Sequence, residues 1–293
     1  MLRTLLLCLA LLCGALPAPA APAAPAAGAC YPADIPTPPL RSQTLVVFDE
    51  TSARDPTAWR DFQAAVQRLA ADPAQRLVML RFAGIAPGQL VARDMDTRLD
   101  AAITNPDQIA ELRIGPFKRS QACVKRQWAA AQQAVQAQLA AWSSTQADQL
   151  ARSEIVYALR RVVADFATPG LPSRLLVYSD GVQNGSGLVF YNAGKPRDID
   201  PALEARRLAQ AGQHLPEQAG PARLAVHWWG LLVDTPAPAR AGRTADARYA
   251  SAQMIEHYSR FWREALLAWG ASSVQIGPTL NNPDLQDIRP PGS

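Results

Sequence analysis

The stretch LVVFDETSA, residues 45–53, indicates the class of fold. Its first four residues are apolar without interruption, which is typical of a strand buried on both faces of a parallel sheet. The stretch LLVYSDG, residues 175–181, has the same pattern of an apolar run that ends close to an aspartate. Two central strands of one sheet are therefore predicted, each with a carboxylate at its end.

Helical patterns alternate with further strand patterns along the chain. Asp55-Pro56 fits an N-cap followed by proline at the first helical position, and an apolar face follows it. We also predict strands at 77–82, 89–95, 224–233 and 274–276, and helices over 124–142, 153–166, 201–212 and 247–269. Residues 104–122, with Pro106 and Pro116, are expected to be irregular. The alternation predicts an α/β fold, a doubly wound and mostly parallel sheet flanked by helices, in one domain.

The two ends of the chain differ from this pattern. Arg3 precedes an apolar stretch that closes with an Ala-x-Ala site at residues 18–20, so residues 1–20 are predicted to be a signal peptide. Residues 21–42 are rich in proline and alanine and are expected to form an extended tether. The folded domain is placed at 43–278, and residues 279–293 are predicted to be a loose tail. We expect a periplasmic or secreted protein.

Composition narrows the range of partners. The 293 residues are 48% hydrophobic and 18% charged, with a formal net charge of +4, which is an ordinary balance for a globular protein. No basic stripe with interleaved aromatic residues is present, so nucleic-acid binding is not expected. No apolar stretch reaches the length of about 20 residues that a membrane span needs. We therefore expect no transmembrane segment.

Two cysteines remain after removal of the signal peptide, Cys30 and Cys123. In an oxidising compartment they are expected to form one disulfide, the alternative being two unpaired thiols. The segment before Cys30 loosely resembles a lipidation box. However, Ala27 stands where a large aliphatic residue is required, and the apolar region lies far upstream, so we expect no lipid anchor.

Asp49 and Asp180 follow two of the predicted strands, where ligand sites form in open parallel sheets. Two carboxylates with nearby hydroxyl groups suit a hard divalent cation such as Mg²⁺. The alternative is that Asp49 and Thr51 cap the following turn and that Asp180 caps a helix or a loop.

These residues resemble the metal-ion-dependent adhesion site of von Willebrand factor A-type (vWA) domains, in particular those of an exported bacterial branch. DETSA at 49–53 is similar to the motif Asp-x-Ser-x-Ser, Ser153 stands in place of the family's threonine, and SDG at 179–181 is similar to Thr-Asp-Gly. The resemblance implies a six-stranded sheet with one antiparallel edge strand. It also implies binding of a protein partner, whose acidic group completes the coordination of the metal.

The resemblance assigns the metal ligands to Asp49, Thr51, Ser153 and Asp180. Ala53 stands where the second hydroxyl belongs, so the site is degenerate and any Mg²⁺ is expected to bind weakly. Ser52 is one position off and would point away on an extended segment. Partner contacts are expected from four residues in the same loops: Glu50, Ser52, Gly181 and Asn184.

The resemblance favours an envelope binding or scaffolding module over an enzyme. Two alternatives stay open. One is a metal-assisted, phosphatase-like hydrolase that uses Asp49 and Asp180, although Thr51 stands where the phosphatase motif has a second aspartate. The other is a domain that has lost its metal and serves only as a structural part of an assembly.

Overall fold

The computed structural model describes residues 30–82, 91–145, 153–185, 187–192, 195–210, 223–233, 250–280 and 283. The predicted signal peptide and most of the predicted tail lie outside these residues. None of the described helices is both long and apolar enough to cross a membrane.

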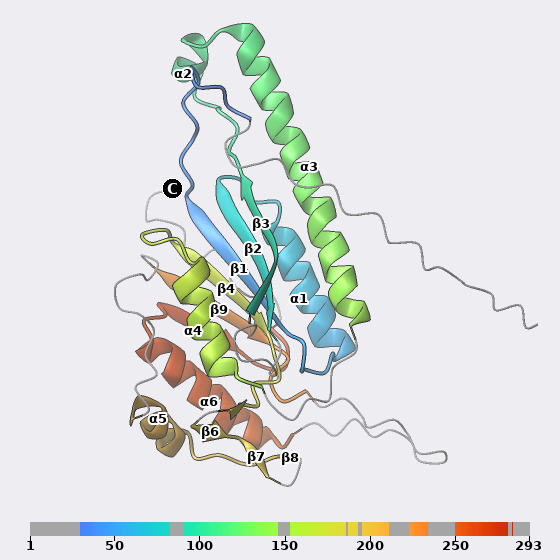
Figure 1. Ribbon diagram of the computed structural model, residues 1–293, viewed down its shortest axis with the longest axis vertical. Coiled ribbons are helices and arrows are strands. Elements are labelled where there is room, and N and C mark those ends of the chain that lie inside the picture. Colours follow the sequence, from blue (N-terminus) through green and yellow to red (C-terminus); the bar gives the residue numbers. More distant parts are fainter. Residues whose placement is uncertain are drawn as a thin grey trace, which may run out of the picture.

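A six-stranded sheet forms the centre of the molecule (Figure 1). Its strands are β1 (Ser42–Asp49), β2 (Gln75–Phe82), β3 (Val91–Leu99), β4 (Ser173–Tyr178), β9 (Leu224–Trp229) and β10 (Ser273–Ile276). They lie in the order β10-β9-β4-β1-β2-β3, and only the edge strand β3 runs antiparallel to its neighbour. This order confirms the predicted doubly wound α/β sheet with one antiparallel edge strand. The strand order reverses between β1 and β4, where such folds place ligand sites.

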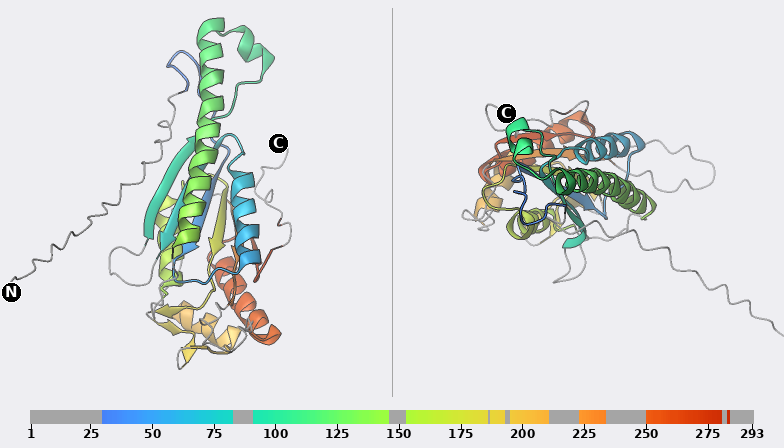
Figure 2. Two further views of the ribbon diagram at one scale, coloured as in Figure 1. Left: turned by 90° about the vertical axis from the view of Figure 1, so that its right-hand side faces the viewer. Right: turned by 90° about the horizontal axis from the view of Figure 1, so that it is seen from above.

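Helices cover both faces of the sheet (Figures 1 and 2). Helices α1 (Pro56–Leu69) and α3 (Ile114–Ser144) pack on one face against Val46 and Phe48 of β1. Helices α4 (Ile155–Phe166) and α6 (Ala252–Ala268) pack on the other face against Leu45 and Val47, and α5 (Pro201–Gln210) packs on α6. The alternating residues of β1 thus supply two separate cores, as the continuous apolar run predicts.

Two short two-stranded ribbons follow β4. Strand β5 (Asn184–Gly185) pairs with β6 (Leu188–Val189), and β7 (Tyr191–Asn192) pairs with β8 (Lys195–Pro196). Strand β9 is shorter than predicted and ends at Trp229, because Gly230 takes a φ of 86° and turns the chain away from the sheet.

The segment 104–122 is helical, so the expectation of an irregular segment is wrong. It contains α2 (Pro106–Ala110) and the first turns of α3, which carries the chain beyond the end of the sheet (Figure 1). Both prolines lie in the first turn of a helix, where the missing N–H has no intrahelical acceptor. Asn105 caps α2 by accepting a hydrogen bond from the N–H of Asp107.

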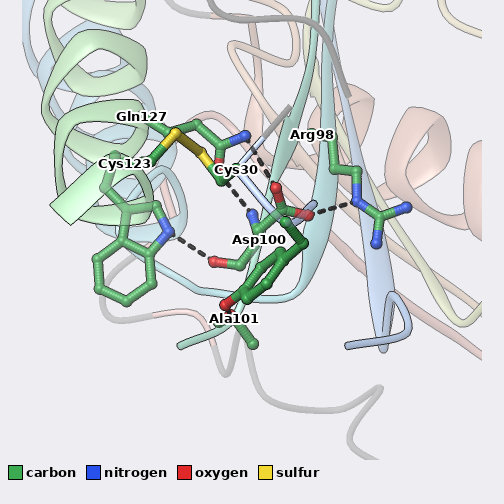
Figure 3. The surroundings of a disulfide bond; sticks show 8 residues. Cys30, Arg98, Asp100, Ala101, Cys123 and Gln127 are labelled. Atoms are coloured by element: carbon green, nitrogen blue, oxygen red, sulfur yellow. Dashed lines mark hydrogen bonds and ion pairs between the residues drawn. A yellow bond between two sulfur atoms is a disulfide. The ribbon is translucent and has the colours of Figure 1, made fainter. Parts of the chain in front are cut away.

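The predicted Cys30–Cys123 disulfide is present, with the Cα atoms 5.3 Å apart (Figure 3). It joins the N-terminal segment to α3, and Cys30, Tyr31 and Ile35 are buried beside it. Buried Asp100 adds hydrogen bonds at the same place, accepting from Arg98 and Gln127. Within the predicted extended tether over 21–42, the described residues from Cys30 to Ile35 are thus held against α3.

Candidate functional site

Asp49 occupies the carboxyl end of β1, the central strand at which the sheet order reverses. Asp49 is completely buried. Oδ1 accepts hydrogen bonds from the backbone N–H of Thr51 at 2.9 Å and from the Thr51 hydroxyl at 2.6 Å. The carboxylate therefore closes the turn that follows β1.

The second oxygen of Asp49 accepts hydrogen bonds from hydroxyl groups in three parts of the chain. Oδ2 accepts from Ser52 at 3.0 Å, from Ser153 ahead of α4 at 3.3 Å and from Ser179 after β4 at 2.7 Å. All three serines are buried. One carboxylate thus holds together three loops at the carboxyl edge of the sheet.

Ser52 connects Asp49 with the second predicted carboxylate. Its hydroxyl accepts a hydrogen bond of 2.8 Å from the backbone N–H of Asp180 while donating to Asp49. The side chain of Asp180, which is half-buried, accepts from the backbone N–H of Val182 at 2.9 Å. Ser52 therefore points toward Asp49, contrary to the expected orientation, because residues 50–52 form a turn instead of an extended segment.

Burial raises the pKa of Asp49 above its ordinary value. The hydrogen bonds from Thr51, Ser179 and Ser52 act in the opposite direction, because they favour the ionised carboxylate. Burial is the stronger influence, because the loss of hydration destabilises the ionised carboxylate more than these neutral hydrogen-bond donors stabilise it. A cation at this position would favour the charged form.

The oxygen donors at this edge fit a hard divalent cation. The carboxylate of Asp49 lies with the hydroxyls of Thr51, Ser52 and Ser153, and the backbone of Asp180 joins them through Ser52. A hydroxyl that donates its proton to Asp49 keeps a lone pair that could bind a metal. Among the described residues, no group of three or more Asp, Glu, His or Cys side chains is arranged to hold a metal. The cation would therefore depend on hydroxyl and water ligands beside two carboxylates.

Charged residues line one side of this edge. The half-buried Glu50 forms an ion pair with Arg81, with a carboxylate oxygen 2.6 Å from a guanidinium nitrogen. Arg81 also forms an ion pair with Asp94 at 2.9 Å. Asp94 in turn accepts a hydrogen bond from the indole of Trp142 at 2.8 Å, near the C-terminal end of α3. The guanidinium of Arg54 lies 5.3 Å from the ring centre of Phe48, and burial lowers its pKa. Glu50 is thus part of an ion-pair network.

The turn beyond Asp180 closes the other side of the site. Gly181 takes a φ of 73°, which favours glycine, and a Cβ there would lie 2.5 Å from Leu231. The backbone N–H of Asn184 donates to the carbonyl of Ser153 at 2.9 Å, and the side chain of Gln183 accepts from the N–H of Val156 at 3.0 Å. The loop after β4 is therefore tied to the start of α4.

The structure brings the four predicted metal ligands, Asp49, Thr51, Ser153 and Asp180, to one edge. The expected partner contacts divide into two groups. Glu50 and Asn184 are half-buried at the edge, whereas Ser52 and Gly181 are buried within the loops. A contact role for the four residues stays a prediction.

From the sequence, no role in the site was predicted for Ser179. It makes the shortest of the three serine hydrogen bonds to Asp49, at 2.7 Å. Its position directly before Asp180 at the end of a predicted central strand is the signal that indicates it.

No family model and no curated protein matches the sequence. Among solved structures, similarity extends to an aerotolerance-related membrane protein of Bacteroides fragilis NCTC 9343, 12% identical over 82% of this chain and 92% of that one, with a TM-score of 0.39. BatB of Bacteroides thetaiotaomicron is 13% identical over 81% and 91%, with a TM-score of 0.38. The pilus adhesin SpaC of Lactobacillus rhamnosus GG is 11% identical over 82% and 28%, with a TM-score of 0.37. Values this low assign no family, and the fold class follows from the strand order itself.

Proposed function

We propose that the chain is an exported vWA-like binding module of the cell envelope, with a protein partner that binds at the carboxyl edge of the sheet. The observation that carries the proposal is the convergence of three loops on Asp49 through the hydroxyls of Ser52, Ser153 and Ser179. The loops that present this edge are held by buried hydrogen bonds, so little entropy is lost when a partner binds them.

We further propose that Mg²⁺ binds weakly at this edge and takes part in recognition. Asp49, Thr51, Ser153 and Asp180 would hold it once hydroxyls that donate to Asp49 turn toward the cation, and Ser52 would supply the hydroxyl that Ala53 lacks. A half-buried Asp180 leaves one side of the donor set accessible to a partner carboxylate. The cation would bridge the partner's acidic group to the domain.

A binding role is favoured over a hydrolase in which Asp49 acts as the nucleophile. A carboxylate nucleophile needs an oxygen that can approach the substrate. Asp49 is fully buried, and both of its oxygens accept hydrogen bonds from the domain's own residues. This arrangement suits a carboxylate that holds loops together.

Site-specific photo-crosslinking in cells that express the protein tests the proposal. A photo-reactive residue at Asn184 is expected to form a discrete protein adduct that is lost when Asp180 is changed to Ala. The matched control places the same group at exposed Arg68, near the C-terminal end of α1 and away from the carboxyl edge of the sheet. Adducts that form equally from both positions, or that persist in Asp180→Ala, would contradict binding at this edge. Phosphatase turnover that is lost in Asp49→Asn would favour the hydrolase.

A further inference from the structure

The helical extension places a separate surface at the other end of the molecule. We call residues 105–126, which comprise α2 and the first turns of α3, the tip. Trp142, at the C-terminal end of α3, contacts Asp94 beside the candidate site, so the long helix leads from that edge to the tip. Figures 1 and 2 show the tip standing clear of the sheet and the other helices. A flat surface can therefore reach the tip without contacting the body of the domain.

Positive charge outweighs negative charge in the tip, where five basic residues stand against the exposed acids Asp107 and Glu111 that precede α3. Helix α3 has 31 residues and no acidic residue, and its four basic residues are all exposed: Lys118, Arg119, Lys125 and Arg126. They form two pairs spaced seven residues apart, so they share one face over two turns. Within the described part of the chain, none of the four is in an ion pair. Unpaired like charges on one helix face repel and do not stabilise the fold.

An apolar residue projects at the apex of this charged face. Ile114, the first residue of α3, is 72% exposed, whereas the other exposed large hydrophobic residues of the described chain reach at most 50%. Leu112 and Phe117 beside it are half-buried. An apolar apex backed by long cationic side chains is the arrangement of proteins that sit in the interface of an anionic bilayer.

We propose that the tip docks obliquely to an anionic phospholipid surface, along the face of α3 that carries the four basic residues. Ile114 inserts among the headgroups, and Lys118, Arg119, Lys125 and Arg126 bind their phosphates. A bilayer fits better than an acidic protein, because mobile headgroups can follow four flexible cations that extend along one helix face from the apolar apex. The docked orientation turns the edge around Asp49 away from the membrane. This proposal stands on the tip alone and does not depend on the proposed function.

Vesicle sedimentation tests the docking. Residues 21–293 are mixed with vesicles of phosphatidylglycerol and phosphatidylcholine, or of phosphatidylcholine alone, at low and at high salt. We expect binding to the anionic vesicles only, weakened by salt because the attraction is electrostatic. Each cation near the surface contributes roughly fivefold to the partition coefficient, so Lys118→Gln with Lys125→Gln is expected to lower it by on the order of tenfold or more. Ile114→Ser is expected to weaken binding while leaving its salt dependence unchanged.

The matched control removes the same charge from the opposite end of the molecule. Arg206→Gln with Arg263→Gln changes two exposed arginines of α5 and α6 and is expected to leave vesicle binding within twofold of the parent. All variants are compared by thermal unfolding to establish that they fold. Equal binding to both vesicle types, equal loss in the control, or absence of binding to anionic vesicles would overturn the proposal. Binding to an acidic protein but not to anionic vesicles at the same salt would also overturn it.

Discussion

The hydroxyl of Ser52 accepts a hydrogen bond from the backbone N–H of Asp180 at 2.8 Å, across 128 residues of chain. The same hydroxyl donates to Asp49, so one small side chain couples the turn after β1 to the end of β4. These two strands are neighbours at the point where the strand order reverses. The geometry of the candidate site therefore depends on Ser52 as much as on the two carboxylates.

Removal of the Ser52 hydroxyl is expected to destabilise the domain. Ser52→Ala leaves a buried carboxylate with one donor fewer and the N–H of Asp180 without this acceptor, at a cost of about 1–3 kcal/mol. Urea unfolding measures the change. Ser144→Ala is the control, because that exposed hydroxyl bonds only within its own helix. Equal loss in the two variants would show that the bridge does not matter.

Gly181 is expected to tolerate alanine much less well than Gly170 does. Both glycines have a positive φ, 73° and 78°, so the backbone strain of an alanine is similar at the two positions. A Cβ at Gly181 would lie 2.5 Å from buried Leu231, whereas nothing lies within 4 Å at Gly170. We expect Gly181→Ala to cost about 1–3 kcal/mol more than Gly170→Ala in denaturant unfolding. Similar losses of stability in the two variants would mean that backbone strain, and not the contact with Leu231, sets the cost.

The disulfide is expected to contribute strongly to stability. Cys30 and Cys123 are 93 residues apart, and closing a loop of this length stabilises by about 4.7 kcal/mol in the chain-entropy model. Unfolding of the parent protein should therefore shift to lower denaturant concentration when a reductant is present. The double variant Cys30→Ala with Cys123→Ala should unfold at that lower concentration with or without reductant. A parent that is insensitive to reductant would contradict this prediction.

Stability is expected to fall in acid partly through Asp96. Burial acts to raise the pKa of Asp96, but the hydrogen bond and charge of Arg76, with the charge of Arg93, outweigh it and leave the pKa lowered. A lowered pKa means that the unfolded chain takes up the proton first as the pH falls. The stabilising contribution is therefore present above about pH 4 and is lost as the pH falls through the lower folded pKa.

The variant Asp96→Asn isolates this contribution. At neutral pH it should be less stable than the parent by about 1 kcal/mol, since the pair is partly solvated. The difference should disappear in strong acid. Asp34→Asn, at an exposed acid without an ion pair in the described structure, should show little difference at either pH. A constant difference for Asp96→Asn across the pH range would contradict the assignment.

The sequence alone predicted the sheet and the two aspartates at its carboxyl edge. Uninterrupted apolar runs predict β1 and β4, and the aspartates that end or follow them, Asp49 and Asp180, are joined through the hydroxyl of Ser52. The direction of Ser52 could not be predicted, because period-two alternation holds for a strand and not for the turn that residues 50–52 form. The helical start of the tip was not predicted, because Pro106 and Pro116 indicate irregular structure when the sequence alone is read. Proline is also common in the first turn of a helix, where both residues lie.

The binding of a divalent cation at the carboxyl edge is tested most directly by thermal unfolding during a Mg²⁺ titration, with Mn²⁺ in parallel. A cation that binds only the folded state stabilises it by about 2.7 kcal/mol at a hundredfold excess over its dissociation constant. The matched variant is Asp180→Asn, in which the amide oxygen can still accept from Val182 and the hydrogen bonds to Asp49 are retained. We predict a melting temperature that rises with Mg²⁺ in the parent and stays constant in Asp180→Asn. No rise in the parent at millimolar Mg²⁺, or an equal rise in the variant, would contradict a cation site formed by Asp49 and Asp180.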